Sequence, residues 1–460
     1  MESRKYEVGI IGGGPGGYKT AELLGAQGVK TVLFERNHIG GVCLNRGCIP
    51  FKNYLSIAKK ISESKESIDA GLAEGQYIQV NHKEVGNKRD GVVSQLQKGI
   101  EATLKSVGVD IVFAEVDLVE KKDEMFRLVT VNGDEVYCNK LVIATGSDEC
   151  RPFEIPKNTN YIVTYGSELL YIKEIPNRTL VIGGGAVGLE VASLLSDTGH
   201  EVEVVEAMSQ IGGDLDSEMS ETLLRIMSKK GIKILTETRL DHFDEKAVFI
   251  TDGNELVEKQ VDCVIIATGR KPQIDFKIVD GLGVEFDERG IHIDDTCKTS
   301  VDGVYACGDV TGGIMLAHEA YRQAKLIVSD VLGFKDVCHC SIIPKIIYSD
   351  PEVVSVGISE QRCIDDNIEY KAHAIPMTYS GRYFAENGKD GAKAKMIINS
   401  KNEVIGLHII GRGVSEISLA MELIVSKRMT IDELKGVVYA HPTYGEIIEE
   451  LANGFSGEFR

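Results

Sequence analysis

The chain has 460 residues, 43% of them hydrophobic and 26% charged, which is the composition of a globular protein of about two to four domains. Its formal net charge of −19 argues against nucleic acid as a partner, because phosphate binding needs clustered Lys and Arg. The charge mainly favours solubility, with a docking face for a basic protein as the alternative. No apolar run reaches the roughly 18 residues of a membrane span, and the first residues lack a signal peptide, so we expect a cytoplasmic protein.

The first recognisable unit is a nucleotide-binding loop near the N-terminus. A strand from Tyr6 to Ile11 leads into Gly12, Gly14 and Gly17, then into a helical pattern and a second strand that ends at Glu35. The first glycine makes a tight turn, the second lets the backbone approach a pyrophosphate, and the third lets the helix pack on the strand. The acidic residue accepts hydrogen bonds from ribose hydroxyls.

Two cysteines lie in a turn rich in glycine and proline directly after this unit. Cys43 and Cys48 enclose four residues, and a helix is predicted to begin at about Ile49. Such a pair can store two electrons as a dithiol and release them as a disulfide, and a helix start favours a thiolate. Two ordinary core thiols and half of a zinc site are the alternatives. Zinc takes four ligands, and no second pair of Cys or His follows nearby. We interpret Cys43 and Cys48 as a redox pair.

A second copy of the nucleotide-binding unit follows. A strand from Thr179 to Ile182 leads into Gly183, Gly185 and Gly188, and a later strand ends at Glu206. The first glycine and the acidic residue are 23 positions apart in both copies (35 − 12 and 206 − 183). A carboxylate at this place favours the free ribose hydroxyl of NAD over the phosphate of NADP.

Both copies end in a strand that runs into an Ala-Thr-Gly turn, at residues 144–146 and 267–269. The first copy is the longer one, because helix-like segments between about Pro50 and Val107 follow the cysteine pair. Cys338, His339 and Cys340 form another thiol cluster. On a strand its histidine would lie opposite the cysteines, so we interpret it as structural, with metal binding as the alternative.

Near the C-terminus, His441 is followed by Pro442, and Glu446 lies five positions after the histidine. A carboxylate bonded to one ring nitrogen fixes the tautomer and leaves the other nitrogen to take a proton. Pro442 suits the first turn of a helix, which would place Glu446 one turn later. From these residues alone, an ordinary histidine at a helix start is the preferred interpretation.

Together these motifs resemble the pyridine nucleotide–disulfide oxidoreductases, and among them the dihydrolipoamide dehydrogenases. The match runs in order through the Gly12 loop, the cysteine pair, the Gly183 loop, the Ala-Thr-Gly turns, Gly308-Asp309 and His441-Pro442-Thr443. The resemblance implies an α/β fold with two Rossmann-like dinucleotide-binding domains, one for FAD and one for NAD, plus a C-terminal α+β dimerisation domain. The implied parts are 1–148 for FAD with the redox-disulfide insertion, 149–270 for NAD, 271–338 completing the FAD region, and 339–460 for the interface.

The resemblance also implies cofactor-binding residues, and it implies no metal site. Those assigned to the FAD region are Gly12, Gly14, Gly17, Glu35, Lys52, Ala114, Thr145, Gly146, Ser147, Asp309, Met315, Leu316, Ala317 and His318. Those assigned to the NAD region are Gly183, Gly185, Gly188, Glu190, Glu206 and Gly269. Lys52 and Glu190 match a lysine–glutamate pair near the reactive nitrogen of the flavin.

In proteins of this kind, the first cysteine exchanges with the substrate and the second lies beside the flavin. The resemblance therefore implies that Cys43 exchanges with the substrate and that Cys48 lies beside the flavin. It makes His441 the base, oriented by Glu446, and it brings His441 to the disulfide of the other subunit of a homodimer. The implied reaction oxidises dihydrolipoamide, which would arrive on a lipoyl-bearing component of a 2-oxo acid, acetoin or glycine-cleavage complex.

Three residues depart from the pattern. Arg46 lies inside the cysteine pair, Phe51 follows Pro50, and Tyr439 stands where many relatives carry a histidine. The alternatives are a glutathione-reductase-like enzyme, which would need arginines after the strand that ends at Glu206, and a mercuric reductase, which would need a C-terminal cysteine pair. A docked flavoprotein subunit or redox sensor is a third alternative.

Overall fold

The computed structural model describes residues 4–172, 176–334 and 342–455, and the chain divides into two compact units. The first unit consists of residues 1–55, 81–151 and 269–339, and the second of residues 56–80, 152–268 and 340–460. The Cys338–Cys340 cluster lies outside the described residues. The four-part division expected from the sequence remains a prediction.

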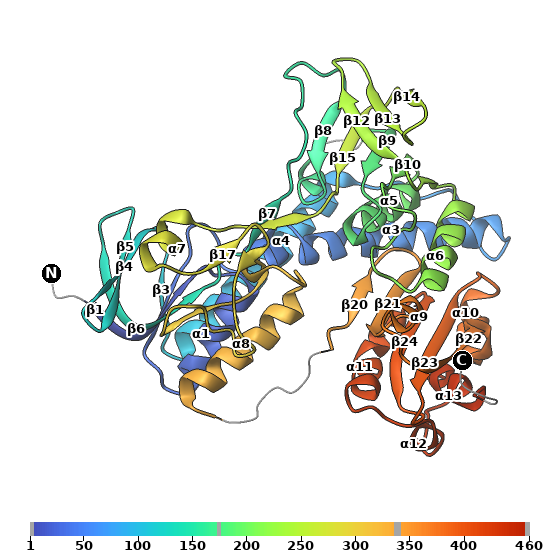
Figure 1. The fold of residues 1–460 in the computed structure, drawn as a ribbon. Helices are drawn as coiled ribbons and strands as arrows, with labels where there is room; N and C mark the ends of the chain where they lie inside the picture. Colours follow the sequence, from blue (N-terminus) through green and yellow to red (C-terminus); the bar gives the residue numbers. More distant parts are fainter. Residues whose placement is uncertain (1–3, 173–175, 335–341, 456–460) are drawn as a thin grey trace. The chain divides into compact units, whose positions relative to one another are not determined.

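The first unit is built on a sheet with the order β3-β2-β1-β6-β5-β4, in which β19 also pairs with β6. Figure 1 labels β1, β3, β4, β5 and β6 of this sheet. Strands β3, β2, β1, β6 and β19 are parallel, and β5 and β4 add an antiparallel extension. The bounds are β1 (Arg4–Ile11), β2 (Thr31–Phe34), β3 (Asp110–Val112), β4 (Val116–Lys122), β5 (Met125–Thr130), β6 (Glu135–Ile143) and β19 (Val304–Ala306).

Both faces of this sheet are covered, so its central strands are almost wholly apolar. Val8 and Ile10 of β1 pack with Leu24 of α1 on one face, and Ile11 packs with Phe34 of β2 on the other. The helices of this unit are α1 (Pro15–Ala26), α2 (Gly41–Asn45), α4 (His82–Ser106), α7 (Phe276–Leu282), η2 (Asp309–Thr311) and α8 (Ala317–Leu332), and the short strands are β7 (Ser147–Glu149), β16 (Arg270–Pro272), β17 (Phe286–Asp287) and β18 (Gly290–Ile291).

The helical region predicted between about residues 50 and 107 is confirmed as two helices. Helix α3 (Cys48–Asp69) begins in the first unit and ends in the second, because the boundary falls after Leu55. Asn81 begins α4, since its side chain accepts a hydrogen bond from the backbone N–H of Glu84, which satisfies one of the unpaired donors of the first turn.

The second unit contains a parallel sheet with the order β11-β10-β9-β15-β8 and an antiparallel sheet of β12, β13 and β14. The strands are β8 (Ile162–Tyr165), β9 (Arg178–Ile182), β10 (Glu201–Val205), β11 (Lys233–Leu235), β12 (Arg239–Phe243), β13 (Val248–Thr251), β14 (Leu256–Lys259) and β15 (Cys263–Ile266), with η1 (Leu169–Tyr171), α5 (Ala186–Asp197) and α6 (Ser217–Lys229). Strand β9, helix α5 and strand β10 follow one another in the order that the sequence predicts for the second unit.

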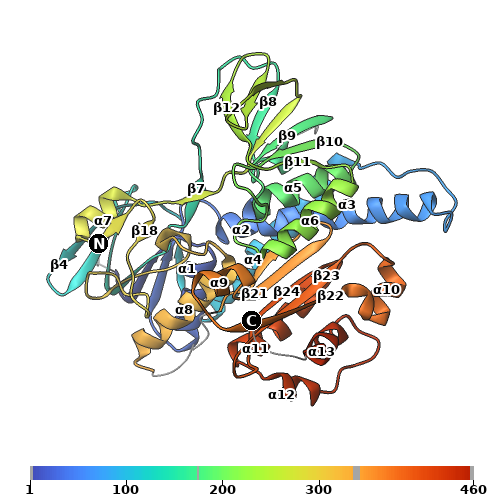
Figure 2. The ribbon, with the colours of Figure 1, turned by 45° about the vertical axis from the view of Figure 1, so that its right-hand side comes forward.

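The C-terminal part is an antiparallel sheet, β20-β21-β24-β23-β22, with helices beside it (Figure 2). Its elements are β20 (Lys345–Ile347), β21 (Glu352–Gly357), α9 (Glu360–Asp365), β22 (Tyr370–Pro376), η3 (Met377–Tyr379), α10 (Gly381–Asn387), β23 (Lys393–Asn399), β24 (Val404–Gly411), η4 (Val414–Ile417), α11 (Ser418–Ser426), α12 (Ile431–Lys435) and α13 (Glu446–Asn453). Met421 of α11, Leu451 of α13 and Met396 of β23 are all buried in one hydrophobic core. The predicted α/β class with a C-terminal α+β domain is confirmed.

A buried ion cluster joins α6 to the C-terminal sheet. The Lys395 ammonium lies 2.8 Å from Asp216, 2.6 Å from Glu360 and 3.3 Å from Glu218, and the Lys395 side chain is only 3% exposed. A buried cation with several carboxylates fixes these elements against one another, because an unpaired charge cannot stay buried at low cost.

We expect Lys395→Met to lower the free energy of unfolding by about 3–5 kcal/mol, since it leaves the carboxylates without a buried partner. Lys393→Met is the matched control. Lys393 pairs with Glu218 at a more exposed site, with 27% of its side chain accessible, and its loss is expected to cost at most about 1 kcal/mol. Urea unfolding followed by circular dichroism at one protein concentration measures both, and equal costs would contradict the prediction.

The same cluster makes stability depend on pH. Burial raises the pKa of the Asp216 carboxyl, but hydrogen bonds from Lys395 and the Glu360 N–H outweigh burial, so the net pKa lies below the ordinary 3.8. A lowered folded-state pKa means that this contribution is present above about pH 4 and is lost as the pH falls further.

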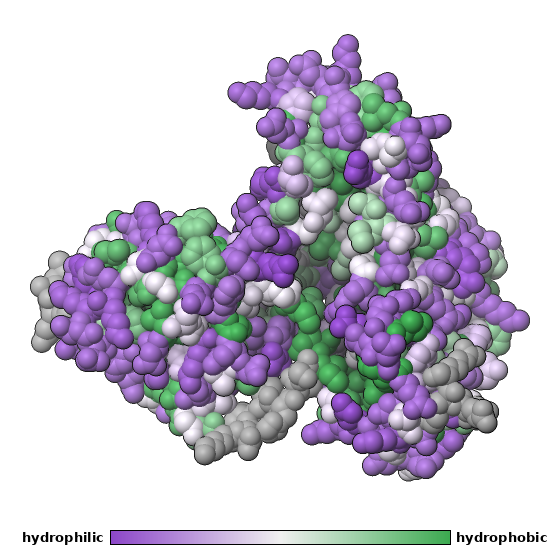
Figure 3. All heavy atoms as spheres, in the orientation of Figure 1, coloured by the Kyte–Doolittle hydropathy of each residue, from purple (hydrophilic) through white to green (hydrophobic). Residues whose placement is uncertain are grey.

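On the face drawn in Figure 3, hydrophilic side chains cover large areas and hydrophobic side chains are exposed between them. No helix in the described ranges combines the length and apolar character needed to cross a membrane. Among the same residues, no group of three or more His, Cys, Asp and Glu side chains is placed to hold a metal ion.

Candidate active site

Cys43 and Cys48 form a disulfide across the turn between α2 and α3, with their Cα atoms 4.8 Å apart. Cys48 is the first residue of α3, as the sequence predicted to within one residue. Cys48 is exposed and Cys43 is partly buried, so reagents can reach the pair. Arg46 ends α2 between them and is exposed.

The backbone before the pair brings it against the first glycine loop. A Cβ atom on Gly41 would lie 2.7 Å from the Cα of Gly14, and Gly41 has φ +59°, a region that favours glycine. The Asn45 amide donates to the carbonyl of Gly41 at 2.8 Å and to that of Ile39 at 3.1 Å. These contacts fix the short helix that carries Cys43.

The described free cysteines differ from this pair. Five of them, Cys138, Cys263, Cys297, Cys307 and Cys363, are buried. Burial raises the pKa of Cys307 to about 12 and that of Cys363 to about 11, so these thiols stay protonated near neutral pH.

The first glycine loop has the close contacts that its sequence predicts. A Cβ on Gly12 would lie 2.2 Å from the carbonyl oxygen of Ala144, and one on Gly17 would lie 1.9 Å from that of Gly12. The Glu35 carboxylate accepts a hydrogen bond from the Gly13 N–H at 2.8 Å. The loop therefore packs tightly and presents backbone at the start of α1, where a helix binds phosphate.

The second loop repeats this geometry. A Cβ on Gly188 would lie 1.9 Å from the carbonyl oxygen of Gly183, and the Glu206 carboxylate accepts from the Gly184 N–H at 2.7 Å. A Cβ on Gly185 would meet no atom within 4 Å, so the turn is open on the side where a pyrophosphate would approach. Both loops fit the dinucleotides expected from the sequence.

The two acidic residues have a structural task that sequence reasoning missed. We expected Glu35 and Glu206 only to bind ribose. Each also accepts a hydrogen bond from the N–H between the first two glycines, and each accepts a second one, from Asn37 and Met208 respectively. The equal spacing of 23 positions in the two copies was the signal that could have revealed this contact.

Asp309 and Ser147 lie together, although they are 162 positions apart: their carboxylate and hydroxyl form a hydrogen bond. Sequence reasoning missed Arg270, which donates to the Ser147 hydroxyl at 2.7 Å and to its carbonyl at 2.8 Å. It also missed Gln323, whose side chain accepts from the Gly308 N–H at 2.6 Å. Arg270 directly follows the second Ala-Thr-Gly turn, and this position was the only feature of the sequence that could have indicated its contact with Ser147.

His441 and Glu446 meet as the sequence predicted, with Nδ1 of the ring 2.6 Å from the carboxylate. The other carboxylate oxygen accepts from the Thr443 N–H at 2.6 Å. The hydrogen bond from Thr443, followed by that from His441, lowers the pKa of the Glu446 carboxyl. The His441 side chain is 77% exposed, so its Nε2 atom can meet a substrate or a second chain.

One expectation about this segment was wrong. Pro442 does not lie in the first turn of a helix, because α13 begins only at Glu446, and residues 441–445 form a loop with a cis peptide bond before Pro442. The loop brings Glu446 back to His441 through the Thr443 N–H.

The remaining predicted residues lie on both units. Thr145 donates to the Gln273 carbonyl at 2.7 Å, and Ala114 is buried just after β3. Glu190 lies on α5 and accepts from the Tyr348 N–H at 3.0 Å. The positions of the others are Lys52 on α3, Gly146 and Gly269 in the Ala-Thr-Gly turns, Met315 and Leu316 before α8, and Ala317 and His318 in its first turn. Lys52 belongs to the first unit and Glu190 to the second, so their pairing stays a prediction.

Comparison with known sequences decides the family. The profile of the family described as pyridine nucleotide-disulphide oxidoreductase matches residues 6–324, and the profile of its dimerisation domain matches residues 343–452. This chain belongs to the pyridine nucleotide-disulphide oxidoreductases. It is therefore a flavin-dependent disulfide oxidoreductase, FAD and NAD(H) are the cofactors of its family, and the dimerisation domain supports a homodimer.

Individual oxidoreductases of this family resemble the chain over nearly its whole length. The dihydrolipoyl dehydrogenase of Geobacillus stearothermophilus is 31% identical, covering 97% of this chain and 95% of the relative. That of Pseudomonas aeruginosa is 30% identical, covering 97% of each. Among solved structures, LpdA from Mycobacterium tuberculosis has a TM-score of 0.86 at 20% identity over 98% of this chain and 99% of its own. The HOCl-induced flavoprotein disulfide reductase RclA from Escherichia coli has 0.83 at 22% over 98% and 100%. These two structures support the fold alone.

Proposed function

We propose that the chain oxidises protein-bound dihydrolipoamide to lipoamide with NAD⁺ as the final electron acceptor. The His441–Glu446 pair, at 2.6 Å, carries this proposal, because oxidation of a dithiol releases protons that a base must take. The accessible Cys43–Cys48 disulfide and the dihydrolipoyl dehydrogenases about 30% identical to the chain add support.

In the proposed reaction, a substrate thiolate attacks the sulfur of Cys43, forms a mixed disulfide and releases Cys48 as a thiolate. Nε2 of His441 takes the proton of the second substrate thiol, because Glu446 holds the other ring nitrogen. That substrate sulfur displaces Cys43, so the substrate leaves as a disulfide and its two electrons remain on the cysteine pair. By the family resemblance, His441 acts on the cysteines of the second copy in the homodimer.

When bound, FAD would accept these two electrons from the cysteine pair, and NAD⁺ would be their final acceptor. Under this proposal the first loop, with Gly12, Gly14, Gly17 and Glu35, holds FAD together with Ser147 and Asp309. The second loop, with Gly183, Gly185, Gly188 and Glu206, holds NAD. The Glu206 carboxylate repels the extra phosphate of NADP, which supports NAD over NADP.

A paired assay tests this function. We expect the purified holoenzyme to reduce NAD⁺ with dihydrolipoamide, and not to reduce glutathione disulfide with NADPH. Activity only in the second assay would support a glutathione-reductase-like enzyme. If neither assay gives turnover while NADH still reduces the cysteine pair, a docked flavoprotein subunit or redox sensor would be favoured. Comparing free dihydrolipoamide with a lipoylated carrier domain then tests the expected partner.

A further inference from the structure

The loop that carries His441 is held in shape mainly by hydrogen bonds among its own residues. Both oxygens of the Glu446 carboxylate are used within it, one by His441 and one by the Thr443 N–H. The Thr443 hydroxyl donates to the carbonyl of Ala440 at 2.8 Å. These bonds fix the shape of the loop, so the direction in which His441 points depends on what attaches the loop to the sheet behind it.

One attachment is made by Ser380, which is fully buried. Its hydroxyl donates to the carbonyl of Thr443 at 3.0 Å. The same hydroxyl accepts from the Tyr383 N–H at 3.4 Å and caps α10. A single buried side chain therefore connects the start of α10 to the middle of the loop that carries His441.

The second attachment is the Tyr444 side chain. Its hydroxyl is hydrogen-bonded to the Glu386 carboxylate and accepts from the Asn387 amide at 3.1 Å. Its ring meets that of Tyr383 edge-on, with 5.1 Å between the ring centres. The guanidinium of Arg382, a residue of α10, lies 5.4 Å from the centre of the Tyr444 ring. All of these contacts reach the loop from one short helix.

Helix α10 is itself fixed to the core. Tyr383 is fully buried, donates to the Asp390 carboxylate at 2.6 Å and accepts from the Arg412 N–H at 3.1 Å. Arg412 forms a two-fold ion pair with Glu66, with its nearest nitrogen 2.6 Å from the carboxylate. Its Nε atom also lies 3.0 Å from the Asp350 carboxylate. The helix is therefore a fixed support.

We propose that Ser380 and Tyr444 are positioning residues for the base, and that α10 is the support through which they hold the His441–Glu446 pair. This inference rests on the proposed function, because it takes His441 as the base. Neither side chain touches the reacting atoms. Each sets the direction of Nε2 by holding the loop, and an error of about 1 Å in the position of a base can cost a large rate factor.

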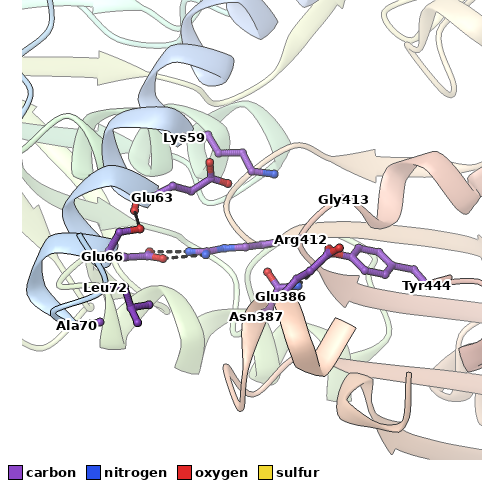
Figure 4. A pocket seen from close by; sticks show the side chains of 11 residues that line it. Lys59, Glu63, Glu66, Ala70, Leu72, Glu386, Asn387, Arg412, Gly413 and Tyr444 are labelled. Atoms are coloured by element: carbon purple, nitrogen blue, oxygen red, sulfur yellow. Dashed lines mark hydrogen bonds and ion pairs between the residues drawn. The ribbon is translucent and has the colours of Figure 1, made fainter. Parts of the chain in front are cut away.

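The main test is Tyr444→Phe, which removes the bonded hydroxyl and keeps the ring. Tyr444 lines a pocket of about 530 Å³ with Glu386, Asn387 and Arg412 (Figure 4), so water can replace the lost hydroxyl without a packing defect. Tyr379→Phe is the matched control, because Tyr379 precedes the same helix and is 60% exposed. Ser380→Ala is the second variant.

We expect Tyr444→Phe and Ser380→Ala to lower kcat for dihydrolipoamide oxidation roughly 10-fold, with little change in KM. NADH-dependent ferricyanide reduction, which needs neither the dithiol nor the base, should stay within about two-fold of wild type in both. The control variant should match wild type in both assays. Equal loss in the two assays would indicate a general structural defect and overturn the proposal.

A double-mutant cycle completes the test. If Tyr444 acts through the base, adding Tyr444→Phe to His441→Ala should cause no further loss. A full additional 10-fold loss would overturn the inference. If His441→Ala alone keeps wild-type turnover, the proposed function fails instead. If His441→Ala is impaired but Tyr444→Phe and Ser380→Ala are not, only the positioning role fails.

Discussion

Cys43→Ser is expected to reduce dihydrolipoamide oxidation at least about 10³-fold, because a serine hydroxyl neither exchanges with a thiol nor forms a disulfide. NADH-dependent ferricyanide reduction should persist, since it requires no thiol exchange. Cys150→Ser is the control, because Cys150 is a described free cysteine that is not fully buried, and it should keep full activity. Steady-state rates of the three proteins check the prediction.

The roles of the two sulfurs can be separated by alkylation. After reduction by NADH, we expect iodoacetamide to modify Cys43 before Cys48, because Cys43 is the proposed exchange thiol. Peptide mass spectrometry reads the order. Preferential labelling of Cys48 would reverse the two roles, and wild-type turnover by Cys43→Ser would remove the disulfide from the mechanism.

His441→Ala is expected to lower dithiol oxidation by about 10²–10⁴-fold, the usual contribution of a general base. His292→Ala is the matched control. His292 also pairs with a carboxylate, that of Asp287 at 3.3 Å, and 54% of its side chain is exposed. The control should keep wild-type turnover, and the oligomeric state of both variants should be unchanged by size-exclusion chromatography.

The pH dependence of the same reaction bears on Glu446. Its pKa lies below the ordinary 4.5 because of the hydrogen bonds from Thr443 and His441. A lowered pKa keeps the carboxylate ionised at every pH above about 5, and it is protonated only in more acidic solution. Protonation of Glu446 is therefore expected to cause no loss of turnover between pH 5 and 8. The infrared band of a protonated carboxyl, appearing between pH 5 and 8 in the wild-type protein and absent from Glu446→Gln, would contradict the lowered pKa of Glu446.

Local patterns with a fixed spacing predicted much of the site. The glycine loops, the turns at Ala144 and Ala267, and the cysteines at the start of α3 each depend on a few consecutive residues, so their geometry is encoded locally. The His441–Glu446 contact was also predicted, but by the wrong route. The spacing between His441 and Glu446 suggested one helical turn. In the structure, a loop over residues 441–445 brings the two side chains together instead.

Contacts between distant segments could not be predicted in this way. Ser380 and Thr443 are 63 positions apart, and Ser147 and Arg270 are 123 apart. An ordinary serine before a helix indicates a cap and gives no sign of a second partner. Such contacts depend on how sheets and helices pack, which no short motif specifies.

The double use of Glu206 limits how the coenzyme preference of this chain can be redesigned. Its carboxylate accepts the N–H groups of Gly184 and Met208, in addition to its proposed contact with ribose. Exchanging it for a cation to accommodate NADP would leave those two N–H groups without their acceptor, and the turn would lose its support. A successful redesign has to place a new acceptor beneath the glycine loop before it changes the charge.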